Sequence, residues 1–182
     1  KPDSTLSALA KRLTESAKDE HEKIAILTRY AQKEINYKAI EFGLRARRPN
    51  PAIETLNHRY GDCKDHALLL QQLLAGAGVK SHLTLLNTGF KTKEEMPSLD
   101  QFNHMILYVP ALGPSGYVDI TGKYGDASAL PGPYFRTKLL VLDPENPGLM
   151  EPPTPPAGSA RTESRRTITV DERGDAHVDD SV

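Results

Sequence analysis

The segment 60–78 constrains the fold more than any other part of this 182-residue chain. Its sequence, YGDCKDHALLLQQLLAGAG, predicts a turn followed directly by a helix that is apolar almost all the way round. Such a helix has to be enclosed by other elements, so the remaining chain is expected to pack around it. Asp62 is the expected N-cap, and Gly76 and Gly78 are expected to end the helix.

Cys63 is the only cysteine of the chain and lies in the first turn of this predicted helix. The free N–H groups and the dipole of a helix N-terminus favour a thiolate over a thiol. Asp62 and Asp65 oppose ionisation unless they point away or are themselves paired, so a histidine partner would matter more than the dipole. A single cysteine excludes an internal disulfide and a multi-cysteine zinc module.

The overall charge and the length of the apolar runs exclude two classes of partner. Lys and Arg number 23 and Asp and Glu number 24, so no net charge attracts nucleic acid or an anionic membrane. No apolar run approaches the ~20 residues of a membrane span. We expect no nucleic-acid partner and no membrane insertion by this segment. The start, KPDST, has no Met and no apolar signal region, and is typical of an excised piece or a mature form.

The elements around the central helix change from helical to strand periodicity along the chain. Two amphipathic helices are predicted first, followed by a short helix with Asn50 as N-cap and Pro51 at its first position. Alternating apolar residues after the central helix predict strands. The fold class is therefore α+β, with N-terminal helices packed on an antiparallel sheet. The predicted helices cover 4–18 and 19–37, and the predicted strands cover 79–85, 103–109, 117–121 and 138–142.

Composition also suggests how the chain is divided. Residues 1–143 are expected to form the core, and 144–160 a semi-rigid linker, since PENPGLMEPPTPP holds six of the 14 prolines. Residues 161–182 contain two short alternating stretches around ERGD, which predict a hairpin. Two strands alone are marginal in water, so this hairpin is expected to begin a further β domain.

Three residues with complementary chemistry follow one another along the core. Cys63 begins the buried helix, His104 lies in an otherwise apolar strand, and Asp119 lies in the next strand. A thiol bonded to an imidazole, which a carboxylate orients through its other nitrogen, forms a nucleophilic triad. The backbone N–H of Cys63 is then a natural donor to an oxyanion.

Strand register decides whether His104 and Asp119 can meet. If a six-residue loop, 111–116, joins the two strands, Asp119 lies opposite Tyr108 and roughly 13 Å along the strand from His104. A tighter loop or a bulge between residues 108 and 117 is therefore expected to close the gap.

Three segments together carry a family resemblance: GDCKDHALLLQQLLAGAG, FNHMILYV and YVDIT. They resemble the bacterial transglutaminase-like proteins, papain-like enzymes often described as cysteine proteases. The resemblance covers roughly residues 4–142 and implies that Cys63 is the nucleophile, His104 the base and Asp119 the residue that orients it. The segments INY and AIEFG resemble a subgroup that carries β domains on both sides of this core. The resemblance also implies a bacterial protein of the cell envelope or periplasm, with no metal or organic cofactor.

The second oxyanion donor is not evident from the resemblance. Animal transglutaminases use a tryptophan for this purpose, and this chain has none. Asn57, six residues before Cys63, and Tyr37 are the candidates for this role.

The expected reaction is acyl transfer at an amide through a thioester on Cys63. The expected substrate is a protein or peptide that offers glutamine or another amide, and either water or an amine acceptor would resolve the thioester. Hydrolysis and transamidation both remain open. An alternative is a non-catalytic binding or scaffolding module of an envelope protein that retains the triad. A zinc site is a further alternative, in which the C-x-x-H pair Cys63 and His66 would bind the metal together with His104 and Asp119. We rank it below the enzyme and the binding module.

Overall fold

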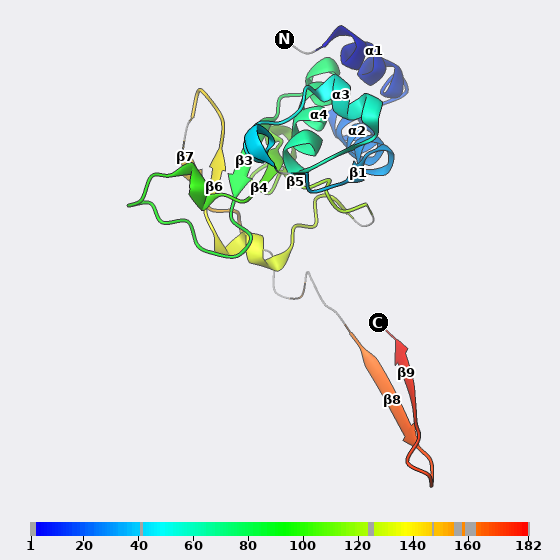
Figure 1. Ribbon diagram of the computed structural model, residues 1–182. Coiled ribbons are helices and arrows are strands. Elements are labelled where there is room, and N and C mark those ends of the chain that lie inside the picture. The colour runs from blue at the N-terminus through cyan, green and yellow to red at the C-terminus, as the bar shows by residue number, and fades with distance from the viewer. Residues whose placement is uncertain are drawn as a thin grey trace.

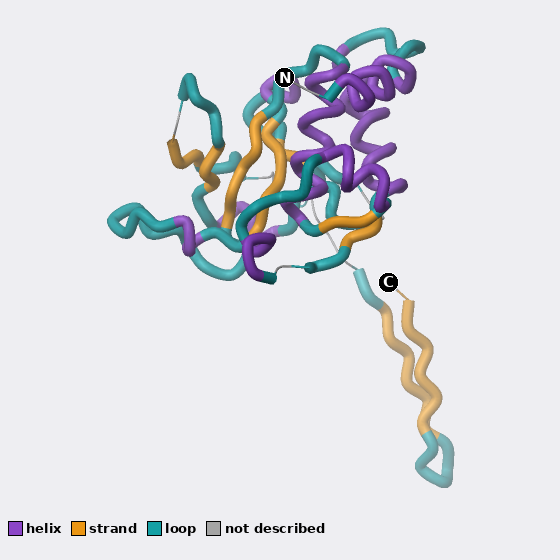
Figure 2. Tube along the Cα trace, turned by 45° about the horizontal axis from the view of Figure 1, so that its top comes forward, coloured by secondary structure: helices purple, strands orange, loops and turns teal. Residues whose placement is uncertain are grey.

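The computed structural model describes residues 3–40, 42–123, 126–146, 148–154, 158 and 163–181. The helices gather on one side of a five-stranded sheet, and a separate hairpin follows near the C-terminus (Figure 1; Figure 2, helices in purple). The four α-helices are α1 (Ser4–Leu13), α2 (Glu20–Glu34), α3 (Ala52–His58) and α4 (Cys63–Gly76). The short 3-10 helices are η1 (Gly43–Ala46), η2 (Leu99–Gln101), η3 (Pro110–Leu112) and η4 (Gly132–Arg136).

The five-stranded sheet is antiparallel throughout, in the order β5-β4-β3-β6-β7. The predicted α+β class is confirmed, because the four α-helices precede the sheet in the chain and α4, which the other three contact, packs against β3 and β4. The five strands are β3 (His82–Leu86), β4 (His104–Tyr108), β5 (Tyr117–Val118), β6 (Leu139–Val141) and β7 (Gly148–Met150).

Helix α4 is the centre of the core, as its apolar sequence predicts. Nine of its fourteen residues are buried, and it packs against α1, α2 and α3 as well as against β3 and β4. The four core leucines, Leu69, Leu70, Leu73 and Leu74, have no exposed surface. Each buried leucine stabilises the fold by about 1.5–3 kcal/mol relative to an exposed one. This packing fixes the position of the helix N-terminus and of Cys63.

Aspartates cap three of the helices. Asp3 accepts hydrogen bonds from the first turn of α1, Asp19 from Glu22 in α2, and Asp62 from the first turn of α4. Each carboxylate satisfies backbone N–H groups that have no partner inside the helix. The expected capping role of Asp62 is confirmed. The expected role of Asn50 is wrong, because α3 begins at Ala52 after Pro51 and has no side-chain cap.

A second, two-stranded element lies next to the start of α4. The strands β1 (Asn36–Tyr37) and β2 (Tyr60–Gly61) pair in parallel, with Tyr37 opposite Gly61. The pairing brings the end of α2 to the residues that directly precede Cys63. Residues far apart in the chain therefore converge at the helix N-terminus.

The register between β4 and β5 differs from the sequence expectation. Tyr108 pairs with Tyr117 and Leu107 with Val118, so the strands are joined by the longer connection 109–116 rather than by six residues. A hydrogen bond from the Val109 N–H to the Gly116 carbonyl closes this connection, which contains η3. A Cβ at Gly116 would lie 2.4 Å from the Val109 oxygen, so this turn requires glycine.

This longer connection, rather than a tighter loop, closes the predicted gap. Continued by one residue beyond Val118, this register points Asp119 toward Ile106, two residues from His104 instead of four. The chain then leaves β4 after Val118, because the Asp119 N–H donates to the Ala127 carbonyl. That departure frees the Asp119 side chain to turn toward His104.

The prediction of a linker in the C-terminal region differs in part from the structure. Within the predicted linker 144–160, Gly148–Met150 forms strand β7 and pairs with β6, because an extended Pro-rich segment can still add an edge strand between its prolines. Residues 147, 155–157 and 159–160 of that linker lie outside the described residues.

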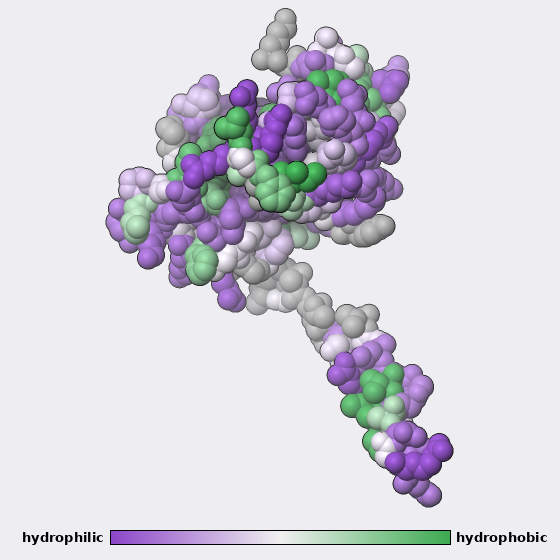
Figure 3. All heavy atoms as spheres, in the orientation of Figure 1, coloured by the Kyte–Doolittle hydropathy of each residue, from purple (hydrophilic) through white to green (hydrophobic). Residues whose placement is uncertain are grey.

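The hairpin predicted around ERGD is confirmed as β8 (Arg165–Val170) and β9 (Ala176–Ser181). Every described residue of its strands is exposed, and Ile168 pairs with Val178. Figure 3 shows hydrophobic surface, in green, on this hairpin. The β domain that it is expected to begin stays a prediction.

Candidate active site

Cys63 is the first residue of α4, and its side chain is buried. Both acidic neighbours that could oppose a thiolate are engaged by other groups. Asp62 accepts hydrogen bonds from the backbone of Lys64 and Asp65, and its other oxygen lies 2.7 Å from Lys64 Nζ. The charge of Asp62 is therefore balanced within the first turn. The helix end retains its preference for an anion at Cys63.

Asp65 connects the start of α4 to the preceding loop. Its carboxylate accepts hydrogen bonds from the Asn50 backbone at 2.6 Å, the Asn50 amide at 3.1 Å and the Asp62 backbone at 3.2 Å. The contact with Asp62 completes a capping box. Asn50 therefore donates hydrogen bonds to Asp65 in the first turn of α4 instead of capping α3.

His104 begins strand β4, and its Nε2 lies 2.9 Å from Asp119 Oδ2. Both side chains are only 11% exposed. The interaction with Cys63 also contributes to raising the pKa of the imidazole. Because Nε2 is engaged by Asp119, Nδ1 is the nitrogen that remains for the thiol. The structure thus brings together the three residues that the sequence selected.

The pair of His104 and Asp119 has strongly shifted pKa values. Burial opposes the charged imidazole, but hydrogen bonds to Asp119 and Cys63 outweigh it and raise the pKa of His104 to about 9. Burial likewise opposes the carboxylate, but the hydrogen bonds from His104 and Thr121 lower the pKa of Asp119 to about 2. An imidazolium paired with a carboxylate is therefore the favoured state at neutral pH, and it is poised to stabilise a thiolate.

Two partners of Asp119 were not identified from the sequence. Thr121 donates its N–H and its hydroxyl to Asp119 Oδ1, at 2.9 and 2.7 Å. The spacing D-x-T is a typical signal for this local turn and could have been used. Tyr134 donates its hydroxyl to Asp119 Oδ2 at 3.1 Å. No local signal predicts that contact, since Tyr134 belongs to η4 in a Gly- and Pro-rich loop.

The two oxyanion candidates lie in different surroundings. Tyr37 is paired with Gly61, and its ring centroid lies 5.9 Å from that of His66, one turn after Cys63. Asn57 is exposed on α3 and lines a hollow with residues of α1, including Leu9 and Arg12. The structure brings Tyr37 to the start of α4 and does not bring Asn57 there.

The arrangement around His66 does not favour the zinc alternative. His66 Nδ1 lies 2.8 Å from the Asp62 carbonyl, and Nε2 is buried without a hydrogen-bond partner among the described residues. Within that part of the chain, no group of three or more His, Cys, Asp or Glu side chains is placed to hold a metal ion. Nor does any helix there have the length and apolar character needed to cross a membrane.

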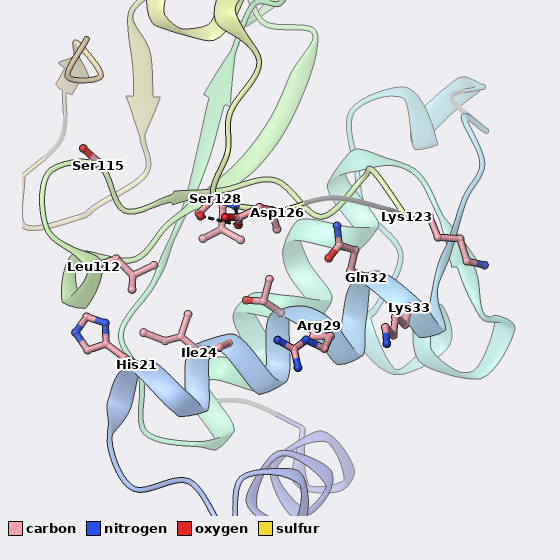
Figure 4. Close-up of a pocket in the computed structure, with 14 residues that line it drawn as sticks. His21, Ile24, Arg29, Gln32, Lys33, Leu112, Ser115, Lys123, Asp126 and Ser128 are labelled. Atoms are coloured by element: carbon pink, nitrogen blue, oxygen red, sulfur yellow. Dashed lines mark hydrogen bonds between the residues drawn. The ribbon is translucent and has the colours of Figure 1, made fainter. Parts of the chain in front are cut away.

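A large hollow of the surface lies apart from the triad residues. It has a volume of about 1110 Å³ and lies between α2 and residues of the segments 112–118 and 126–128. His21, Arg29 and Lys33 line it on the helix side, with Asp126 and Ser128 opposite (Figure 4). None of the three triad residues lines this hollow. We therefore assign the chemistry to the buried cluster and not to this hollow.

The sequence matches one family model of known proteins. Residues 7–105 match the family model of the transglutaminase-like superfamily, a span that includes Cys63 and His104 and ends before Asp119. No curated protein matches the sequence.

Two solved structures align with this chain. A candidate protease from Parabacteroides distasonis aligns with a TM-score of 0.61 at 19% identity, over 84% of this chain and 28% of that one. A candidate cysteine protease from Cytophaga hutchinsonii aligns with a TM-score of 0.43 at 16% identity, over 97% of this chain and 50% of that one. This chain thus spans half or less of each of those proteins. The family match covers more than half of the residues of this chain. The chain therefore belongs to the transglutaminase-like superfamily.

Proposed function

We propose that this chain is a cysteine-dependent enzyme that transfers an acyl group from an amide through a thioester on Cys63. The observation that carries the proposal is the 2.9 Å contact between His104 Nε2 and Asp119, in a site where Cys63 also acts on the pKa of the imidazole. Family membership supports a catalytic cysteine in general terms. The roles of the individual residues are our inference.

In the first half-reaction, the Cys63 thiolate attacks the amide carbonyl carbon and a C–S bond forms. The Cys63 N–H and a second donor, for which Tyr37 is the candidate, stabilise the oxyanion. His104, as imidazolium, gives its proton to the leaving nitrogen as the C–N bond breaks. Asp119 keeps the imidazole oriented and stabilises its charge. The products are an amine and a thioester.

In the second half-reaction, neutral His104 takes a proton from an incoming nucleophile that attacks the thioester carbonyl carbon. The C–S bond then breaks and Cys63 leaves as the thiolate, which restores the thiolate–imidazolium pair. Water yields a carboxylic acid, and a primary amine yields a new amide. The proposed substrate is a protein or peptide that presents glutamine or another amide. The same chemistry serves hydrolysis and transamidation, because the two differ only in which nucleophile reaches the thioester.

One observation favours a second candidate, a binding or scaffolding module that retains the triad without turnover. Cys63 is only 3% exposed, so an amide reaches the sulfur only if neighbouring side chains move. A thiol that stays covered would leave the surface around it to bind a partner.

Alkylation by iodoacetamide across pH 5–10 separates the two candidates, and Cys63 is the only thiol available to react. If the chain is a cysteine-dependent enzyme, we expect wild-type Cys63 to react well below pH 8 and His104→Ala to lose that low-pH reactivity. His58→Ala is the matched control, because His58 is exposed on α3. A thiol that titrates near its ordinary pKa, or stays inert in all three proteins, would favour the binding module.

Incubation with a glutamine peptide and a fluorescent primary amine then distinguishes the two reactions. Mass spectrometry would identify a peptide carrying the amine for transamidation, or a peptide with glutamate in place of glutamine for hydrolysis. A Cys63→Ala control must abolish both products.

A further inference from the structure

Tyr134 lies against both members of the pair of His104 and Asp119. Its side chain packs in an apolar cluster that includes Ile106 and Leu139, and it is only 7% exposed. Its ring centroid lies 5.7 Å from that of His104, with the rings tilted by 56°. Its hydroxyl donates to Asp119. The core therefore holds the apolar ring of Tyr134, while its hydroxyl bonds to the charged Asp119. This arrangement restricts the movement of both side chains.

The carboxylate of Asp119 is held by four donors on two oxygens. Oδ2 accepts from His104 at 2.9 Å and from Tyr134 at 3.1 Å. Oδ1 accepts both of its hydrogen bonds from Thr121, at 2.9 and 2.7 Å. An ionised carboxylate offers about four acceptor sites, so this one is fully used. Rotation of the group would break bonds at both oxygens.

We propose that Tyr134 is a positioning residue that holds Asp119 Oδ2 toward His104 and excludes water from the imidazole–carboxylate pair. The proposal rests on the proposed function, since it assigns Tyr134 a role in the same site. Tyr134 acts through Asp119: its hydroxyl is directed at the carboxylate, so it is not a catalytic residue.

The local chemistry keeps Tyr134 in its donating form. Burial and the neighbouring Asp119 charge both raise the pKa of the phenol well above its usual value. The hydroxyl therefore retains its proton throughout the pH range in which the pair of His104 and Asp119 is charged. Hydrogen bonds to a charged group are stronger in a buried site than in water. The buried Tyr134 ring helps to exclude water from the Asp119 carboxylate and thereby strengthens the hydrogen bond that the Tyr134 hydroxyl donates.

Two other roles for Tyr134 make different predictions. As a space-filling residue, it would contribute through its ring alone, and removal of the hydroxyl would not change the chemistry. As a competitor of His104 for Oδ2, it would weaken the pair, and removal of the hydroxyl would raise the imidazole pKa and the thiol reactivity. The positioning role predicts the opposite change.

The test is Tyr134→Phe in the full chain, which keeps the ring and removes the hydroxyl. Tyr108→Phe is the matched control, because Tyr108 lies on the same strand as His104 and packs against the same apolar cluster. Both are compared with the wild-type protein in iodoacetamide alkylation from pH 5 to 10 and in NMR titration of the His104 ring. Thermal unfolding checks that each variant is folded.

The positioning role expects Tyr134→Phe to slow alkylation of Cys63 at pH 6 by about tenfold, as the loss of one hydrogen bond to a charged group implies. The imidazole pKa should fall toward its ordinary value, and Tyr108→Phe should leave both quantities unchanged. In an Asp119→Asn background, Tyr134→Phe should have no further effect, because the carboxylate through which it acts is gone.

Several outcomes would overturn the inference. Unchanged or faster alkylation in a folded Tyr134→Phe protein does so, and so does an undiminished effect in the Asp119→Asn background. If Tyr134→Phe does not fold, NMR of the wild-type protein decides: a slowly exchanging Tyr134 hydroxyl proton is expected between pH 5 and 8, and its absence contradicts the proposal. Failure of wild-type Cys63 to react below pH 8 is a separate result, since it contradicts the proposed function itself.

Discussion

Asp62 and Lys64, the two residues on either side of Cys63, form a buried ion pair with Lys64 Nζ 2.7 Å from Asp62 Oδ2. An acidic residue next to a nucleophilic thiol would normally oppose the thiolate. Here Asp62 caps the helix while Lys64 balances its charge. The first turn of α4 thereby combines a capped N-terminus with a sulfur that has no uncompensated anion beside it.

The first prediction concerns this pair. Lys64→Met should lower the free energy of unfolding by about 3–5 kcal/mol, because removal of one partner leaves a buried charge uncompensated. It should also slow alkylation of Cys63 at pH 6. Urea unfolding measures the first effect and iodoacetamide the second. Lys80→Met is the control: it breaks an exposed ion pair with Glu145 and should change neither quantity appreciably. Equal stability of Lys64→Met and wild type would contradict this account.

The second prediction is a pH dependence of stability. The pKa of His104 is raised from 6.5 to about 9, so its stabilising contribution is complete below about pH 6.5 and is lost as the pH rises through 9. The pKa of Asp119 is lowered from 3.8 to about 2, so its contribution is present above about pH 3.8 and is lost as the pH falls through 2. The pair should therefore stabilise the fold most between about pH 4 and 6.5, by about 3 kcal/mol.

The measurement compares free energies of unfolding for wild type and His104→Gln from pH 3 to 10. The difference between the two curves should shrink between pH 6.5 and 9. His58→Gln, at an exposed site, should not produce that pattern. A difference that stays constant across this range would show that the pair of His104 and Asp119 does not form in solution.

The third prediction concerns the close approach before the helix. A Cβ at Gly61 would lie 2.5 Å from the Asp65 Cβ, so Gly61→Ala must displace the capping box. We expect a loss of about 1–3 kcal/mol in stability, measured by chemical denaturation, together with slower alkylation of Cys63. Gly148→Ala serves as the control, since no atom lies within 4 Å of the corresponding Cβ. A fully stable and reactive Gly61→Ala protein would refute the expectation.

The fourth prediction concerns the loop 38–50, which is attached to the start of α4 at both ends. The Lys38 N–H donates to the Gly61 carbonyl at 2.8 Å, and the Asn50 N–H donates to Asp65 at 2.6 Å. Asp65→Ala removes the second attachment and should accelerate tryptic cleavage at the exposed arginines of this loop several-fold. Gel electrophoresis and mass spectrometry locate the cut.

Asp100→Ala is the comparison for that experiment, because it removes an exposed ion pair between Arg47 and a different loop. Its effect on cleavage should be small, since exposed pairs are weak. If Asp100→Ala accelerates cleavage as much as Asp65→Ala does, the loop is held by its surface contact rather than by its attachment to α4.

The sequence by itself determined the local features of this protein. The run of leucines in 60–78 made a buried helix necessary, and Asp62 with Asp65 defined where that helix begins. Alternating residues placed His104 and Asp119 on the same face of neighbouring strands. The family resemblance gave these residues their expected roles, and residues 7–105 match that family. The helix, its start and the faces of the strands each depend on residues within a few positions of one another, where periodicity and capping chemistry are decisive.

Only the tertiary structure decided how these groups meet. The connection 109–116 set a register that the turn residues alone did not reveal, and the bond from Asp119 to Ala127 turned the carboxylate toward His104. Tyr134 reached that carboxylate from a Gly- and Pro-rich loop with no periodicity to place it. Lys64 turned back to Asp62, and Asn50 bonded to Asp65 instead of capping α3. Such contacts join side chains across loops, and their geometry follows from the packing of the whole core rather than from any local pattern.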